Sequence, residues 1–275
     1  SVKFKLSEPN YGYVRVTQFQ EHSAEDLAKA IKTLYAQNKA PLKGLVLDLR
    51  NNPGGLITAA VGISAAFVQK DALVVYTEGR AEDAKMRLTA NANNYARNGD
   101  KGDFLRDLPA EVKNVPMVVL INGGSASASE IVSGALQDHK RAVIMGTQSF
   151  GKGSVQTILP MNNGTAIKLT TARYFTPNGR SIQAKGIVPD IVVEDPANPS
   201  DASLNLREAD LSNHLSNPKE AETQTAPKPP VVKPDAKDKQ FADKTPMEAG
   251  TKSDYQFMQA INLLKGMDIL NPNKK

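Results

Sequence analysis

The sequence predicts an α/β fold, and three observations lead to that prediction. Short apolar runs typical of buried strands recur along the first two thirds of the chain, for example at residues 44–49 and 115–121. Segments whose apolar residues keep helical spacing lie between these runs. The chain has 275 residues, of which 40% are hydrophobic, so it can bury a sizeable core. Strands that alternate with helices favour a sheet covered by helices.

The expected elements follow one another in a regular order. Residues 1–6 and 11–16 read as strands. Ser23 is followed three residues later by an acid, which predicts a capping box ahead of a helix with Leu27 and Ile31 on one face. The further expected elements are a strand at 44–49, a helix at 56–67, strands at 73–76 and 115–121, a helix at 129–136, and strands at 142–145, 155–159 and 165–170.

Composition divides the chain into three parts. Residues 1–195 have the composition of a globular domain, although residues 77–114 are polar and predict a long surface excursion with short helices. Residues 196–252 are expected to form a largely disordered linker, because a segment rich in Pro, Lys, Asp and Thr buries too little apolar area to offset its chain entropy. A second capping-box pattern at 253–256 predicts an amphipathic C-terminal helix over 253–270, which packs either on the core or on a partner subunit.

Charge and composition exclude several classes of function. The formal net charge is +5, but the lysines are scattered without interleaved aromatics, so no nucleic-acid partner is expected. No run of eighteen apolar residues predicts a membrane span, and the first residues lack the pattern of a signal peptide. Cysteine is absent, which excludes thiol nucleophiles, disulfides and cysteine-ligated zinc from this chain.

The stretch G-T-Q-S-F-G-K-G at residues 146–153 comes close to a phosphate-binding loop. That motif requires Ser or Thr after the lysine, and here Gly153 follows Lys152. It also requires a helix whose N-terminus supports the phosphates, whereas residues 154–159 alternate like a strand. Nucleotide binding is therefore disfavoured, and Lys152 is left for another role.

A run of serines, G-S-A-S-A-S-E at residues 124–130, lies between a buried strand and a helix. This junction exposes a side chain at a sharp turn and surrounds it with free backbone N–H groups, which suits a nucleophile. The same position suits serine as a helix cap, so the pattern alone leaves both roles open.

The base that would activate such a serine is either a histidine or a lysine. His22, His139 and His214 each fit a solvated or capping role, and a G-x-S-x-G motif is not met because Ser129 replaces its second glycine. Lysine can act as a base where its amine is desolvated. Lys152, between two glycines at the end of an expected buried strand, is the natural candidate.

The segment SASASEIVSGALQD followed by GTQSFGKGSVQ resembles the signature of the carboxy-terminal processing, or tail-specific, proteases, the serine endopeptidases of peptidase family S41. Three further blocks agree: GYVRVTQF, LDLRNNPGG and ARYFTPNGRSIQAKGIVPDI. The blocks span residues 11–193 in the order that the family has.

The resemblance implies a set of catalytic residues. It places the nucleophile on Ser127, the base on Lys152, and a third member on Gln156. A neutral glutamine can orient the lysine without favouring its charged form. The backbone amides of Gly55 and Ala128 would form the oxyanion hole, and glycine lets the backbone approach the substrate carbonyl closely. No metal or organic cofactor is expected.

The resemblance also implies a fold, a location and partners. We expect an α/β protease core of the ClpP and crotonase type, without the PDZ domain that precedes it in the family. The expected activity is cleavage of exported proteins at or near their C-terminal regions, in the periplasm, by a Ser/Lys dyad. Substrates are proteins or peptides; an adaptor protein and a homo-oligomer formed through the C-terminal helix are left open. Asp48 and Arg50 are expected to form a structural ion pair.

A second hypothesis is a non-catalytic peptide-binding or scaffolding module that assembles through the C-terminal helix. The missing PDZ domain and the long polar tail favour it. The presence of Ser127, Lys152 and Gln156 together favours the protease, since a chain without activity would be free to lose them.

Overall fold

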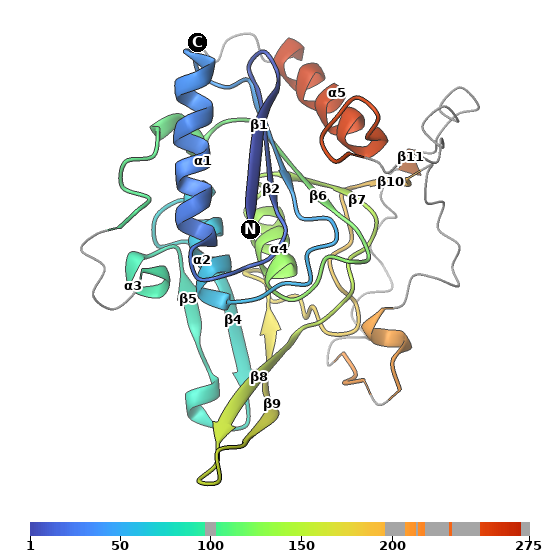
Figure 1. Ribbon diagram of the computed structural model, residues 1–275. Coiled ribbons are helices and arrows are strands. Elements are labelled where there is room, and N and C mark those ends of the chain that lie inside the picture. Colours follow the sequence, from blue (N-terminus) through green and yellow to red (C-terminus); the bar gives the residue numbers. More distant parts are fainter. Residues whose placement is uncertain (97–102, 196–206, 213, 218–230, 233–247, 271–275) are drawn as a thin grey trace.

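The computed structural model describes residues 1–96, 103–195, 207–212, 214–217, 231–232 and 248–270. In these residues one large sheet lies between two layers of helices, and a smaller sheet extends from its side (Figure 1). The predicted α/β class is confirmed.

The larger sheet has seven strands in the order β1-β2-β3-β6-β7-β10-β11. Its first pair is antiparallel, β1 (Val2–Glu8) with β2 (Tyr11–Val16). All other neighbours are parallel, namely β3 (Gly44–Asp48), β6 (Met117–Ile121), β7 (Val143–Gly146), β10 (Ile191–Val193) and β11 (Val231–Val232). β3 and β6 are buried along their whole length, so β6 and residues 45–47 of β3 are continuously apolar rather than alternating.

Helices cover both faces of this sheet. The helices α1 (Ser23–Asn38), α2 (Ile57–Phe67) and α4 (Ala128–Asp138) pack on one face, and α5 (Tyr255–Leu270) packs on the other. Successive side chains of a strand point to opposite faces. Accordingly, Leu47 of β3 lies in the core beneath the first three helices, and its neighbour Val46 lies beneath α5.

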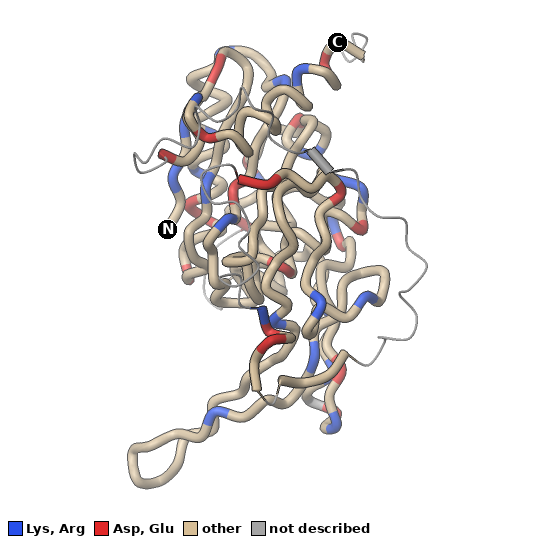
Figure 2. Tube along the Cα trace, turned by 90° about the vertical axis from the view of Figure 1, so that its right-hand side faces the viewer, with Lys and Arg blue, Asp and Glu red and all other residues tan. Residues whose placement is uncertain are grey.

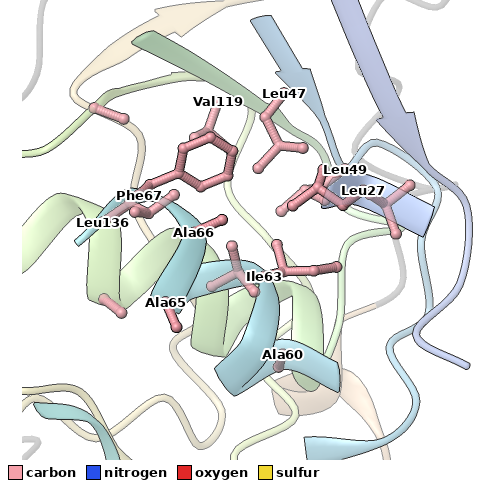
Figure 3. Packing of buried hydrophobic residues seen from close by; sticks show 14 of the residues in the cluster. Leu27, Leu47, Leu49, Ala60, Ile63, Ala65, Ala66, Phe67, Val119 and Leu136 are labelled. Atoms are coloured by element: carbon pink, nitrogen blue, oxygen red, sulfur yellow. The ribbon is translucent and has the colours of Figure 1, made fainter. Parts of the chain in front are cut away.

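The larger core is centred on side chains of α2. Figure 3 shows Phe67 among Leu47, Val119 and Leu136, all of which are fully buried. Truncation of such an aromatic side chain to alanine typically costs about 3–5 kcal/mol of folding free energy. This packing holds α2 and α4 against the strands that precede them, and so fixes the start of each helix relative to the sheet.

The smaller sheet is antiparallel throughout and has the order β5-β4-β9-β8. Its strands are β4 (Leu73–Gly79), β5 (Arg87–Thr89), β8 (Ser154–Pro160) and β9 (Ala166–Phe175). The far end of the β8–β9 hairpin extends away from the body of the molecule (Figure 1). It forms an exposed ribbon whose edge strand is β8.

The polar excursion expected at residues 77–114 is more ordered than the sequence suggests. Its described residues contain the end of β4, β5, α3 (Ala92–Tyr95) and short 3₁₀ turns at Glu82–Ala84 and Ala110–Lys113. Residues 97–102 lie outside the described part of the chain.

The capping box predicted at Ser23 is wrong. Ser23 is the first helical residue, and His22 occupies the cap position without a side-chain hydrogen bond. The Ser23 hydroxyl accepts a hydrogen bond from the backbone N–H of Gln20 (2.8 Å) and donates to the carbonyl of Gln18 (3.1 Å). It therefore closes the turn before the helix and is unavailable as a cap.

The C-terminal helix was predicted correctly, but its cap lies one residue later than expected. The carboxylate of Asp254, rather than the hydroxyl of Ser253, accepts a hydrogen bond from the N–H of Phe257 (3.1 Å). Of the two packing alternatives, the structure has the helix on the core of its own chain. Its apolar side chains Phe257, Ile261 and Leu264 are buried against the sheet.

Most of the expected linker, residues 196–252, lies outside the described residues. The described parts contact the core: β11 pairs with β10, and the N–H of Glu208 donates to the carbonyl of Phe150 (3.1 Å). In the part of the chain that the structure describes, no helix is both long enough and apolar enough to cross a membrane.

Candidate active site

Three neighbouring parallel strands bring the predicted site residues to one edge of the large sheet. β3, β6 and β7 lie side by side, and each is followed by a turn that carries one of the sequence motifs. The turns comprise residues 49–56, 122–127 and 147–153. Carboxyl ends of parallel strands meet at the same sheet edge, which is where α/β proteins bind ligands. Gly55, Ser127 and Lys152 come from these three turns.

Ser127 occupies a strained backbone conformation between β6 and α4. Its φ and ψ are 53° and −111°, a region that non-glycine residues adopt at a cost of roughly 1–3 kcal/mol. A serine nucleophile at a strand-to-helix turn is held in the same manner. Ser127 directly precedes the first residue of α4, so the positive end of the helix dipole lies beside it.

The three serines of the run have different environments. Ser125 and Ser129 are fully buried, and their hydroxyls donate to the carbonyls of Leu49 and Asn52, each at 2.8 Å. These bonds join the turn after β6 and the first turn of α4 to the turn after β3. The side chain of Ser127 is only partly buried, so it alone among the three serines has a hydroxyl open to a substrate.

The turn after β3 brings Gly54 against this serine, and Gly55 follows it against Phe19. A Cβ on Gly54 would lie 2.8 Å from the Cβ of Ser127 and 2.9 Å from the nitrogen of Ala128, and a Cβ on Gly55 would lie 2.0 Å from the carbonyl oxygen of Phe19. Both positions therefore require glycine, and both have positive φ. Within the described residues, the N–H groups of Gly55 and Ala128 donate no hydrogen bond. Two amides beside the serine are thus available to a ligand.

Lys152 lies in the turn between β7 and β8, where close backbone contacts require the glycines on either side. A Cβ on Gly153 would lie 2.3 Å from the nitrogen of Gln183, and Gly151 has φ of 99° against the backbone of residues 184–186. The N–H of Gly153 donates to Gln183 Oε1 (3.1 Å). The G-K-G pattern is therefore explained by packing, and β8 follows it as a strand, as the sequence predicted.

Glu130 joins the serine turn to the lysine turn. It is fully buried in α4, and its Oε2 accepts the backbone N–H groups of Ser127 (2.7 Å) and Lys152 (3.0 Å). Its Oε1 accepts the hydroxyl of Ser149 (2.6 Å) and the N–H of Gly151 (2.7 Å). Burial raises the pKa of Glu130 to about 7, while these four hydrogen bonds oppose the rise.

Glu130 was not predicted as a site residue, although the sequence contains a signal for it. Residues 127–130 read S-A-S-E, the S-x-x-E spacing of a capping box, in which the acid returns to the N–H of the capping residue. Tyr174 of β9 was also missed, because no chemical role was assigned to the sequence block at residues 172–191 in which it lies. Burial raises the pKa of Tyr174 to about 12, and the neighbouring Ser127 hydroxyl opposes that rise.

The remaining candidates are more distant or more exposed. His139 caps the C-terminal end of α4, which by helix geometry is ~16 Å from the end that carries Ser127, and its ring contacts the carbonyl of Leu73 (2.7 Å). That position excludes His139 as the base for this serine. Gln156 is exposed on β8 opposite Thr170, and its side chain makes no hydrogen bond within the described residues. The side chains of Ser127 and Lys152 likewise share no hydrogen bond there.

The described residues offer no cluster of three or more His, Cys, Asp or Glu that could hold a metal ion. The groups gathered at this edge are instead a hydroxyl, an amine and free amides. Such a set can perform nucleophilic attack, proton transfer and stabilisation of an oxyanion.

Comparison with known proteins identifies the family of the chain. The model of peptidase family S41 matches residues 10–193. A carboxy-terminal-processing protease of Bartonella bacilliformis is 44% identical over 271 residues, which cover 97% of this chain and 54% of that protein. The carboxy-terminal processing protease CtpB of Bacillus subtilis is 39% identical over 212 residues, covering 76% of this chain and 40% of that protein. The chain spans about half the length of the Bartonella relative and less than half the length of the Bacillus relative.

Solved structures show the same fold. A photosystem II D1 C-terminal processing protease superposes with a TM-score of 0.56 at 31% identity, over 74% of this chain and 50% of that chain. A lipoprotein from Streptococcus agalactiae superposes with a TM-score of 0.54 over 74% of this chain and 67% of that chain, at 19% identity. The second likeness concerns the fold alone.

Proposed function

The chain belongs to peptidase family S41, and from that premise we propose that it is a serine endopeptidase with a Ser127/Lys152 dyad. The observation that carries the proposal is the environment of Ser127. This serine alone of its run is accessible, it is held at positive φ, and two free amides lie beside it. An extended peptide carbonyl placed there meets both a nucleophile and hydrogen-bond donors.

The proposed reaction has two steps. Lys152, as the neutral amine, takes the proton of the Ser127 hydroxyl while the oxygen attacks the scissile carbonyl carbon. The amides of Gly55 and Ala128 stabilise the oxyanion, and the lysine passes the proton to the leaving amine. Water then hydrolyses the acyl-enzyme by the same proton transfers. Gln156 orients the lysine amine, and the contact forms when substrate covers the exposed start of β8.

The proposed substrates are exported proteins, cut at or near their C-terminal regions in the periplasm. The names of the relatives and the family resemblance support this class. An unfolded segment can bind extended along the free edge of β8, the strand that begins two residues after Lys152. The hairpin is nearly free of charged residues (Figure 2), and Ile158, Leu159 and Leu169 are exposed on it. Apolar segments of substrate therefore suit this edge.

An adaptor protein and a homo-oligomer belong to the same proposal. The apolar side of α5 is buried on its own sheet, so a second copy would meet only the last turn of the helix, where Ile269 and Leu270 are exposed.

The protruding β8–β9 hairpin is the observation that favours the second candidate function, a peptide-binding module without catalysis.

Cleavage of unfolded casein tests the proposal and separates the two functions. We expect Ser127→Ala and Lys152→Ala each to lose at least about 10⁴-fold in kcat, as catalytic groups that act as a unit do. Ser125→Ala and Ser129→Ala should lose far less, because each removes a hydrogen bond between turns and no reacting group. Cleavage by the Ser127→Ala variant would contradict the proposal. Binding of casein without cleavage by the wild type would favour the binding module.

A further inference from the structure

A buried cluster of charges connects α5 to the turn that carries Gly54 and Gly55. At its centre is Arg50, which is 4% exposed. Its Nε and Nη2 donate to Asp48 (3.0 and 2.7 Å), and its Nη1 and Nη2 donate to Asp254 (2.9 and 2.5 Å). Nη1 also donates to Gln256 Oε1 (3.0 Å). The five N–H donors of the guanidinium are all used, three of them by the C-terminal segment.

The cluster holds one guanidinium between two carboxylates in a buried place. Burial alone would raise the pKa of Asp48, but the Arg50 guanidinium and further hydrogen bonds lower it below its ordinary value. Burial alone would lower the pKa of Arg50, and its two carboxylate partners raise it well above the ordinary value. The ion pair expected between Asp48 and Arg50 is confirmed, and Asp254 joins it as a third member that was not predicted.

The C-terminal segment is itself held in place at this point. The carboxylate of Asp254 accepts the N–H groups of Gly250 (2.9 Å) and Phe257 (3.1 Å). A Cβ on Gly250 would lie 2.7 Å from the ring of Tyr13, and the ring of Phe257 packs edge-on against the same tyrosine at 5.3 Å. The Tyr13 hydroxyl in turn donates a hydrogen bond to the carboxylate of Asp48 (2.7 Å). Asp254 therefore presents its charge to Arg50 in one orientation.

From Arg50 the chain runs directly into the candidate oxyanion turn. The side chain of Asn52 is fully buried: its Nδ2 donates to the carbonyl of Val16 (2.7 Å), and its Oδ1 accepts the N–H of Gly54 (2.9 Å). The Asn52 carbonyl accepts the N–H of Ala126 (3.0 Å) from the serine turn. A shift of Arg50 would therefore reach Gly55 through the four residues of the turn between them, in which Asn52 is fixed by these hydrogen bonds.

We infer that Asp254, supplied by the segment that leads into α5, is a positioning residue of this active site, because it fixes Arg50 and through it the turn that presents the Gly55 amide. The inference rests on the proposed function. The role is geometric: Asp254 touches no reacting atom, and it supplies two of the five acceptors that prevent Arg50 from adopting another rotamer. Small displacements of catalytic groups are costly, since about 1 Å can lower a rate about 100-fold.

The test is Asp254→Asn in the full chain, with Asp268→Asn as the matched control. Asn keeps the shape of the side chain and one acceptor oxygen but removes the negative charge. Asp268 is on the same helix, where it pairs with Lys43 at the surface (2.9 Å), far along the helix from Arg50. Initial rates with fluorescein-labelled casein give kcat and KM, and a fluorophosphonate probe reports the reactivity of Ser127 independently of substrate binding.

We expect Asp254→Asn to lower kcat at least about tenfold, with KM within about twofold of the wild type, because the loss concerns the transition state alone. Labelling by the fluorophosphonate should slow in parallel, and Asp268→Asn should match the wild type in both assays. Unchanged kcat in Asp254→Asn would overturn the inference.

A third variant separates positioning from simple loss of stability. Leu264→Ala removes a buried contact of α5 without touching Arg50. If Leu264→Ala lowers kcat as much as Asp254→Asn at an equal fall in the thermal midpoint, Asp254 acts only by stabilising the fold and the inference is wrong. If the wild type neither cleaves casein nor reacts with the probe, the proposed function fails and the inference fails with it. If the wild type is active and all three variants match it, only the inference fails.

Discussion

Two buried carboxylate sites support the turns that carry the candidate site residues, and they are built in opposite ways. Glu130 is held by four neutral donors, and no cation contacts it among the described residues. Asp48 and Asp254 share one guanidinium, that of Arg50. The first site raises the pKa of its acid to about 7, whereas the second lowers the pKa of Asp48.

The difference teaches that burial by itself does not determine the charge of a carboxylate. Hydrogen bonds from neutral amides favour the ionised form but do not overcome desolvation, and a full positive charge does. Glu130 can therefore change its protonation state near neutral pH, while Asp48 and Arg50 keep their charges. One site joins two turns of the core, and the other joins the core to a helix 204 residues away in sequence.

The largest expected effect comes from removal of the cation. Arg50→Met leaves Asp48 and Asp254 facing each other in a buried site without a counter-charge. Breaking a buried ion pair in this way typically costs about 3–5 kcal/mol of unfolding free energy, to be measured by urea denaturation. The control is Arg15→Met, since Arg15 is partly exposed and lies 3.8 Å from Asp48, and it should cost at most about 1 kcal/mol. Equal losses in the two variants would mean that Arg50 is not the counter-charge on which this site depends.

A smaller effect, on activity rather than stability, is expected at Glu130. Glu130→Gln puts an NH₂ group opposite amide donors, so one pair of its four hydrogen bonds is lost and the serine and lysine turns separate. We expect kcat to fall about 10- to 100-fold with little change in KM, as for loss of geometry in the transition state. Glu25→Gln, at an exposed pair with Lys29, should leave kcat unchanged. A Glu130→Gln variant with wild-type kcat would show that activity does not require the hydrogen bonds by which Glu130 joins the two turns.

The smallest effect is a pH dependence whose sign differs between the two sites. The folded pKa of Glu130 is raised from 4.5 to about 7, so its stabilising contribution is fully present below pH 4.5 and is lost as pH rises through about 7. The lowered pKa of Asp48 has the opposite effect: its contribution is present above its ordinary value of 3.8 and is lost only in more acidic solution.

Urea unfolding at pH 5 and pH 8 measures this difference. The stability of the wild type relative to Glu130→Gln should fall between the two pH values by on the order of 1 kcal/mol. The stability of the wild type relative to Asp48→Asn should stay constant between pH 5 and pH 8. A constant difference for Glu130→Gln would mean that the carboxylate does not titrate near pH 7.

Local patterns were enough to predict the elements that support the site. The runs at 44–49 and 115–121 are apolar because β3 and β6 are covered on both faces, and the helices after them keep clear spacing. β5 and β10 were missed because each has only three residues, too few for a periodic signal. The caps at Ser23 and Ser253 were misplaced because neighbouring turns, which the pattern does not contain, decide where each hydroxyl bonds.

The site itself was predictable to the extent that it is local. The glycines around Lys152 and the serine at the start of α4 follow from their own segments, and Glu130 was within reach of the S-x-x-E spacing. The contact of Arg50 with Asp254 was not, because no pattern in either segment refers to the other. The roles of Ser127, Lys152, Gln156, Gly55 and Ala128 stay predictions that the proposed variants test.

The position of Asp254 also sets an order of events during synthesis of the chain. The turns with Gly55, Ser127 and Lys152 leave the ribosome at least a hundred residues before Asp254 does. Until then Arg50 lacks the three acceptor contacts that the last segment provides. A nascent chain therefore carries every candidate catalytic residue while its oxyanion turn is still without its final support. The segment that leads into α5 thus supports the site only after the three turns have been made, because Asp254 follows Lys152 by more than a hundred residues.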